Sequence, residues 1–197
     1  MYSDFKGYLF EGSKILDIGI NDTQAKKLYR FYELLIEKNK VMNLTSITDL
    51  REVTYKHFID SISLIKVFED LSFKDYSIAD LGTGAGFPGI PLAIMFPNLK
   101  LTLIDSLNKR INFIKDICDQ LDIINIEAIH KRAEEISRDS EYRESFDICV
   151  SRAVANLSSL SEYCLPLVRP GGRFVSYKSK GADTEITDAK KAIKILG

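Results

Sequence analysis

Residues 80–91 read DLGTGAGFPGIP, a stretch in which glycine occupies positions 82, 84, 86 and 89. An ordinary surface turn needs one glycine, so four of them indicate a loop whose main chain is closely approached by a ligand. Asp80 closes the apolar run before this loop, and Asp105 closes the next apolar run along the chain. A ligand of this loop therefore has to fit beside the bare backbone and be compatible with the two carboxylates.

The ligand of this loop can be narrowed by elimination. Gly84, Gly86 and Gly89 fit the pattern G-x-G-x-x-G of dinucleotide sites, but the Asp80 carboxylate would oppose a pyrophosphate, and prolines at 88 and 91 remove amide donors. The sequence contains no G-x-x-x-x-G-K-[ST], which disfavours a nucleoside triphosphate. S-adenosylmethionine carries no phosphate, and its ammonium and sulfonium groups tolerate an acid. Asp105 would then bind the ribose hydroxyls, with capping of helix 107–121 as its alternative or additional role.

The elements that position these residues alternate along the chain. Short apolar runs rich in branched residues predict five strands, at 77–81, 100–105, 124–129, 146–151 and 172–178. The segments between them predict helices, most clearly 107–121. This alternation predicts an α/β fold with a doubly wound, mainly parallel sheet, in which ligands bind at the carboxyl ends of the strands. The glycine loop follows the first strand and therefore lies at that edge.

The first part of the chain has a different texture. Residues 22–39 and 49–69 each place apolar side chains on one helical stripe, with Asn21 or Asp22 and Thr48 or Asp49 available as N-caps. We therefore expect a small helical N-terminal cap over residues 1–72, followed by a ligand-binding domain over residues 73–197.

Composition limits the possible functions. The 197 residues are 45% hydrophobic and 28% charged, as in a soluble globular protein, and the net charge of −1 means that a nucleic-acid site must come from local clusters of lysine and arginine. Three separated cysteines and two histidines indicate neither a metal site nor a disulfide framework. The sequence shows no signal peptide and no membrane span. We expect a cytoplasmic monomer with no metal and no membrane partner.

Three segments together carry a family resemblance. DLGTGAGFPGIPLAI (80–94), LIDSLNKRINFI (103–114) and SRAVA (151–155) resemble the small-subunit ribosomal RNA guanine-N7 methyltransferases, also called glucose-inhibited division protein B. NLTSI (43–47) and HFIDS (57–61) are similar to the N-terminal region of that family, and the resemblance runs from about residue 20 to the end. It implies a Rossmann-like class I methyltransferase that uses S-adenosylmethionine. Its implied substrate is N7 of one guanine in the 530 loop of 16S rRNA (nucleotide 527 in the usual rRNA numbering), in naked rRNA or a 30S-like particle.

The resemblance also implies which residues bind the cofactor. Ala133 is small enough for an adenine to lie flat beside it, and the alternative role of Arg152 is an ion pair with Asp80 or Asp105. Beyond residue 134 we expect the charged segment 131–144 to be solvated. The full set, including Asp80 and Gly84 from the loop itself, is Asp80, Gly82, Gly84, Phe87, Asp105, Ser106, Ala133, Glu134 and Arg152.

Methylation of guanine N7 needs no general base, because N7 carries a lone pair and no hydrogen, so catalysis is mostly positioning and electrostatics. Cys164 does not follow a proline, which disfavours pyrimidine C5 chemistry, and SRAVANL stands where amine methyltransferases carry an Asn/Asp-Pro-Pro motif. No residue is a certain catalyst. The candidates for positioning the substrate are Arg152, Asn43, His57 and Lys178, with a satisfied core histidine as the alternative for His57. Further basic residues expected at the same edge are Lys109, Arg110, Lys131, Arg132 and Lys180.

Two other functions stay open at this point. One is a non-catalytic RNA-binding or ribosome assembly factor on a methyltransferase fold, and the other is a small-molecule methyltransferase. The resemblance also implies a final pair of strands beyond residue 197. We expect the edge of strand 172–178 to be open without them.

Overall fold

The structure is a computed structural model that describes residues 1–152, 155–178 and 181–196. Within these residues, five parallel strands form one sheet in the order β3-β2-β1-β4-β5. The strands are β1 (Ser77–Leu81), β2 (Lys100–Asp105), β3 (Ile126–His130), β4 (Phe146–Arg152) and β5 (Val168–Tyr177). The strand order reverses beside β1, which is the switch point of a doubly wound sheet. The predicted α/β fold is confirmed.

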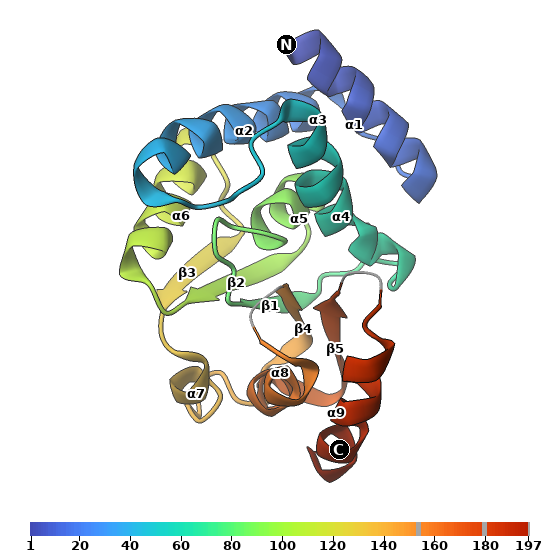
Figure 1. Cartoon of the computed structure of the whole chain (residues 1–197), viewed down its shortest axis with the longest axis vertical. Coiled ribbons are helices and arrows are strands. Elements are labelled where there is room, and N and C mark those ends of the chain that lie inside the picture. Colours follow the sequence, from blue (N-terminus) through green and yellow to red (C-terminus); the bar gives the residue numbers. More distant parts are fainter. Residues whose placement is uncertain (153–154, 179–180, 197) are drawn as a thin grey trace.

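The two faces of the sheet bury alternate residues in two different apolar cores. Ile78 and Leu103 pack in the larger core, whereas Ala79 and Ile104 pack in the smaller one. Figure 1 shows the resulting layers, with the blue and green helices on one side of the sheet and the orange and red helices on the other. The larger core lies under the N-terminal helices and two helices of the second part of the chain, α5 (Gly89–Met95) and α6 (Asn108–Leu121). The remaining elements are α7 (Ala133–Ile136), α8 (Leu157–Cys164), the 3₁₀ turn η3 (Leu165–Leu167) and α9 (Asp183–Leu196).

The N-terminal cap is helical, as predicted, but its helices differ in detail. It contains α1 (Tyr2–Leu16), α2 (Asp22–Met42), α3 (Leu50–Val53), the π-helical turn η1 (Thr54–Ile59), α4 (Asp60–Ile62) and the 3₁₀ turn η2 (Ser63–Lys66). The stripe over 49–69 is thus four short pieces rather than one regular helix. Asn21 caps α2 in a capping box with Gln24, and Asp49 caps α3. No side chain caps the start of α1, so the usual start signal of a helix is missing there.

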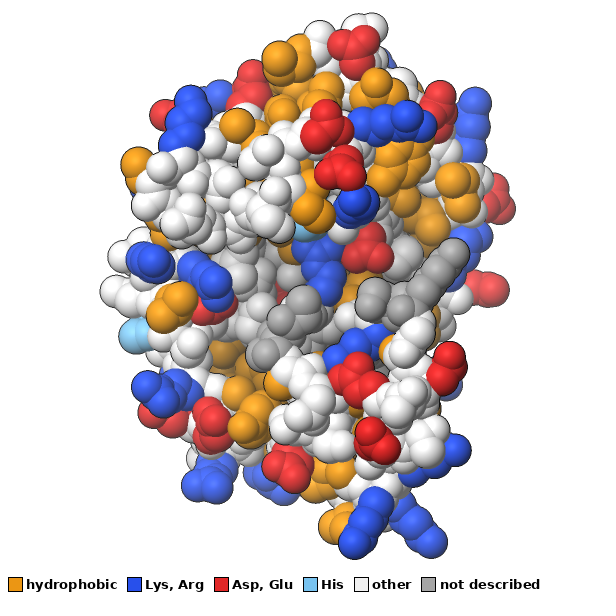
Figure 2. Space-filling view, viewed as in Figure 1, with side chains coloured by type: hydrophobic (Ala, Val, Ile, Leu, Met, Phe, Trp, Pro, Cys, Tyr) orange, Lys and Arg blue, Asp and Glu red, His pale blue; other side chains and the backbone are white. Residues whose placement is uncertain are grey.

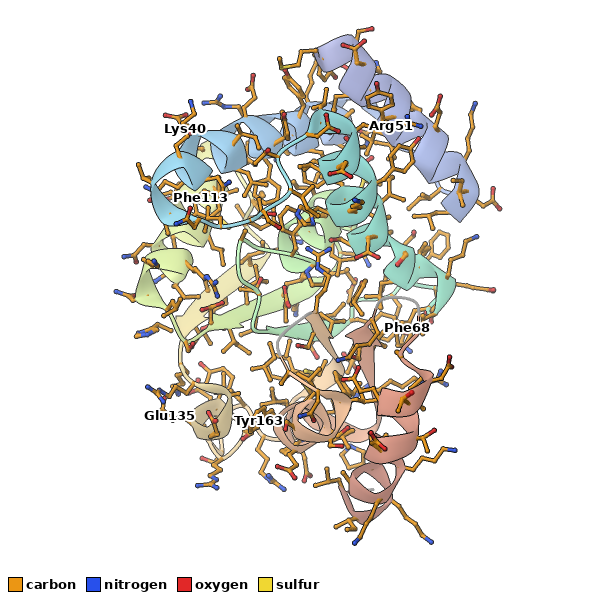
Figure 3. All side chains as sticks on the ribbon, in the orientation of Figure 1. Lys40, Arg51, Phe68, Phe113, Glu135 and Tyr163 are labelled. Carbon is orange, nitrogen blue, oxygen red and sulfur yellow. The ribbon has the colours of Figure 1, made fainter. Side chains whose placement is uncertain are left out.

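The cap and the sheet share their main apolar core. Phe31 and Phe58 of the cap pack against Phe87 of the glycine loop, with ring centroids 5.1 and 5.8 Å apart. Phe113 of α6 lies between that helix and α2, where the two helices meet (Figure 3). The division of the chain after residue 72 stays a prediction, and the buried apolar cluster crosses it.

Two strands begin at other residues than predicted, and the ends of β3, β4 and β5 each differ by one residue. Strand β3 begins at Ile126 rather than at 124, because Ile124 is 96% exposed and contributes nothing to the sheet. Strand β5 begins at Val168, four residues before the predicted start, and pairs there with Phe146. Among the described residues, no helix has the length and apolar composition needed to cross a bilayer.

Candidate functional site

A cavity of about 720 Å³ lies between the cap and the carboxyl ends of β1, β2 and β4. Its size is within the range of small-molecule sites, roughly 300–1,000 Å³. The residues predicted for the cofactor and found in its wall are Gly82, Gly84, Phe87, Asp105, Ser106, Ala133 and Arg152. The fold therefore brings together residues from the ends of several strands and from the cap, as the parallel sheet predicts.

The glycines of the loop after β1 have two separate structural roles. Gly82 and Gly84 line the cavity with φ of 74° and 61°, in the left-handed region that favours glycine. A Cβ at Gly84 would meet no heavy atom closer than 4.0 Å. At Gly86 and Gly89, in contrast, a Cβ would lie 2.3 Å from Ile90 Cδ1 and 2.6 Å from Leu103 Cδ1. The first pair shapes the cavity wall, and the second pair allows α5 to pack closely under the loop.

Asp80 lies beneath this loop and is fully buried. Its Oδ2 accepts hydrogen bonds from Thr83 Oγ1 (2.7 Å) and from the Gly89 amide (2.9 Å), so it joins the two ends of the loop. Its Oδ1 has no partner among the described residues. Burial raises the pKa of Asp80 to about 6, against the lowering effect of the two hydrogen bonds. Asp80 does not line the cavity, and its contact with a cofactor stays a prediction.

Asp105 connects the loop, the end of β2 and the start of α6. Its Oδ2 accepts from the Gly84 amide (3.0 Å) and from Arg110 Nη1 (3.2 Å), and its Oδ1 accepts from the Leu107 amide (2.8 Å). The carboxylate thus supports the backbone before α6 and also lines the cavity, but α6 has no side-chain cap, so the capping role is not found. The contact of Asp105 with ribose hydroxyls stays a prediction. The neighbouring Ser106 is exposed and lines the same wall.

Ala133 and Glu134 begin α7, beyond the end of β3. Ala133 lines the cavity, whereas Glu134 is exposed and does not. The segment that follows is mostly exposed, with Ile136 and Ser137 buried beneath it. Placement of an adenine against Ala133 stays a prediction, and the structure puts that residue at the correct edge for it.

Arg152 ends β4 and faces the cap. Its Nη1 donates to Asp60 Oδ2 (3.0 Å) and to the Lys56 carbonyl (3.2 Å), and its guanidinium carbon lies 5.1 Å from the Phe87 ring centroid. The side chain is only 16% exposed. Arg152 is therefore an ion-pair partner of Asp60, and not of Asp80 or Asp105 as considered from the sequence.

His57 lies between Arg152 and a loop of the cap. Its ring stacks on Phe87 with centroids 4.7 Å apart, its Nδ1 lies 3.4 Å from Arg152 Nη2, and its Nε2 lies 2.9 Å from Thr45 Oγ1. Burial, and then the Arg152 charge, lower the pKa of His57 to about 4. The ring is therefore neutral at neutral pH. Its Nδ1 also lies 3.2 Å from the Lys56 carbonyl, which can only accept, so this contact fits a tautomer in which Nδ1–H donates to Lys56 and Nε2 accepts from the Thr45 hydroxyl.

Thr45 and Asp60 are among the residues of this wall that the sequence analysis did not select. Both lie in the segments 43–47 and 57–61, beside the residues that were selected. Asn43 is exposed, with φ of 49° as the C-cap of α2, and does not line the cavity. Thr45 does so because Asn39 holds its main chain, donating to the Thr45 carbonyl (2.9 Å) and accepting from its amide (2.8 Å).

The remaining basic residues predicted near the substrate lie partly in the cavity wall and partly away from it. Arg110 and Lys131 line the cavity. Lys178 does not, because its Nζ donates to the Ala155 carbonyl (2.9 Å) and to Glu185 Oε1 (2.6 Å) of α9. Lys180 lies outside the described residues. Figure 2 shows basic and acidic side chains mixed over this face of the molecule, so any RNA contact rests on individual cations.

Comparison with known proteins agrees with this geometry. The family described as "GidB: rRNA small subunit methyltransferase G" matches residues 24–197. The chain belongs to this family. Relatives named ribosomal RNA small subunit methyltransferase G include those of Lachnoclostridium phytofermentans, 49% identical over 95% of this chain and 76% of the relative, and Staphylococcus aureus, 48% identical over 96% and 78%.

Solved structures of other methyltransferases share the fold at low identity. A SAM-dependent O-methyltransferase from Thermotoga maritima superposes with a TM-score of 0.56 at 16% identity, over 82% of this chain and 55% of that one. A sarcosine dimethylglycine methyltransferase described as putative, from Galdieria sulphuraria, gives 0.57 at 16% identity, over 76% and 63%. These likenesses support the class I methyltransferase fold and say nothing of the substrate.

Proposed function

We propose that the chain transfers a methyl group from S-adenosylmethionine to N7 of a guanine in the 530 loop of 16S rRNA, at nucleotide 527. The observation that carries the proposal is the cavity with two chemically different walls. One wall is glycine backbone with the Asp105 carboxylate, and the other holds Arg152 beside His57 and Phe87. The first suits a cationic cofactor with ribose hydroxyls, and the second suits an RNA nucleotide. The names of the relatives support methylation of small-subunit ribosomal RNA.

The sheet-side residues fit S-adenosylmethionine. Gly82 and Gly84 have left-handed backbone and present no side chain to the cavity that they line. A Cβ at Gly84 would lie beside this wall without meeting a heavy atom closer than 4.0 Å. A carboxylate has about four acceptor positions, and Asp105 uses three of them, so one can accept a hydroxyl. Ser106 and Ala133 would complete this wall, with Asp80 and Phe87 supporting the loop from behind. The bound cofactor supplies an activated methyl group.

The cap-side residues bind and orient the substrate. Arg152 presents a guanidinium that can hold an RNA phosphate with two parallel hydrogen bonds. Neutral His57 lies between that guanidinium and Thr45 and adds no second charge. N7 of guanine carries a free lone pair, so no residue has to remove a proton. The chain's contribution is therefore to position the two partners and to exclude water.

The test is methyl transfer in vitro to 16S rRNA, offered both naked and as 30S subunits from cells that lack the modification. We expect 7-methylguanine at nucleotide 527, mapped by cleavage at the modified base. Arg152→Ala should lower the rate at least tenfold, about 1.4 kcal/mol in the activation free energy. Methylation at another nucleotide, or of metabolites without RNA, would contradict the proposal. Binding of rRNA without transfer would favour the assembly-factor alternative.

A further inference from the structure

We propose that Asp60 is a positioning residue of this reaction, which holds the Arg152 guanidinium on the substrate side of the cavity. The inference rests on the proposed function, because it assigns Arg152 to the substrate. Asp60 follows the π-helical turn of the cap and lines the cavity, and its Oδ2 accepts from Arg152 Nη1 at 3.0 Å. The two residues are 92 positions apart in the sequence.

The guanidinium is held from the cap at several points. Nη1 is shared between Asp60 and the Lys56 carbonyl, Nη2 lies at His57 Nδ1, and the plane lies near the Phe87 ring. Of these partners, only Asp60 carries a negative charge. Short π-helical turns occur frequently at functional sites, and this one places a carbonyl, an imidazole and a carboxylate around one cation.

The position of this charge matters because two other carboxylates belong to the glycine-loop side, one buried beneath the loop and one in the opposite wall of the cavity. Asp80 has a buried, unpartnered Oδ1, and the Arg152 charge already lowers its pKa. Asp105 is 3% exposed and lines the opposite wall. Without Asp60, the guanidinium would be drawn toward these acids, on the side of the cavity that we propose for the cofactor. Asp60 therefore keeps the cation with the RNA and away from the cofactor.

The ion pair between Asp60 and Arg152 contributes little to the stability of the fold. The Asp60 side chain is 44% exposed, and ion pairs of such exposure contribute little to folding. The chain offers a matched control, because Arg30 Nη1 and Glu33 Oε2 also form a 3.0 Å pair within the cap, on α2. Glu33→Gln also removes one carboxylate charge from an arginine pair, in this case a local pair with both side chains well exposed, and neither partner lines the cavity.

The experiment compares Asp60→Asn with Glu33→Gln in methyl transfer to 30S subunits, with thermal unfolding measured for each. We expect Asp60→Asn to lower kcat/KM for the subunit at least fivefold with little change in melting temperature, and Glu33→Gln to leave it within twofold. In the Arg152→Ala background, Asp60→Asn should cause no further loss, because it acts through Arg152. Activity of Asp60→Asn within twofold of wild type, or additive losses in the double variant, would overturn the inference.

A spectroscopic measurement keeps this result separate from the proposed function. Guanidinium N–H signals of Arg152, assigned by their loss in Arg152→Lys, report whether the group is held. We expect them to be resolved in the wild type and Glu33→Gln and broadened in Asp60→Asn. If the wild type methylates no rRNA, the proposed function fails, and unchanged Arg152 signals in Asp60→Asn would then refute the role of Asp60 as well.

Discussion

Asp80→Asn should change how the stability of the protein depends on pH. The ordinary pKa of an aspartate is 3.8, and burial raises that of Asp80 to about 6 in the folded chain. The folded state therefore binds a proton more tightly than the unfolded state. As pH rises, the unfolded chain releases this proton first, and the free energy of unfolding falls until the pH is above 6. Asparagine does not titrate, so the variant lacks this loss.

The magnitude follows from the shift. A difference of about two pH units corresponds to about 3 kcal/mol at pH values well above 6. Over the accessible window from pH 5 to pH 7.5, the wild type should lose about 1.4 kcal/mol relative to Asp80→Asn. The asparagine oxygen can still accept from Thr83 and Gly89. Its amide replaces the unpartnered Oδ1, which lowers stability by about 1–3 kcal/mol at every pH.

The assay is urea unfolding of both proteins at several pH values, with the difference between their free energies of unfolding plotted against pH. His57 has a lowered pKa, so its contribution is lost as pH falls from 6.5, but it is present in both proteins and cancels. Asp22→Asn is the control, because hydrogen bonds from Lys26 and Lys6 lower the pKa of Asp22 to about 2 and its difference curve should be flat in this window. A flat curve for Asp80→Asn would refute the reasoning.

Three further variants test the loop and the contact between cap and sheet. Gly84→Val should weaken binding of S-adenosylmethionine at least tenfold by calorimetry, because the residue lines the cavity with φ of 61°; preferential binding of NAD would contradict the cofactor. Gly89→Ala should lower the free energy of urea unfolding by about 1–3 kcal/mol, since its Cβ would lie 2.6 Å from Leu103 Cδ1; an unchanged midpoint would show that the leucine moves freely. Tyr177→Phe should lower it by about 1 kcal/mol, because the hydroxyl donates to the Ser61 carbonyl at 2.8 Å; no loss would mean that this bond is replaced by water.

Local patterns were enough to predict the sheet and one wall of the site. Strands β1 and β2 begin and end where predicted, because a strand buried on both faces is mostly apolar and stands out from its neighbours in the sequence. Asp105 faces the glycine loop because the carboxyl ends of neighbouring parallel strands meet at one edge. These relations depend on strand order and period, which the sequence carries directly.

The helix α1 was missed because it lacks a capping side chain, although Phe5 and Leu9 are fully buried.

The cap-side wall depends on contacts that no local pattern reports. Periodicity shows which face of residues 49–69 is buried, but the π-helical turn decides that Asp60 and His57 both meet Arg152. Lys178 follows its strand as expected, and only the packing of α9 gives it Glu185 as a partner. The sequence by itself determined the fold, the family and the glycine-loop wall of the cavity. The tertiary structure decided which charges pair, because pairing depends on the distance between side chains that lie far apart in the chain.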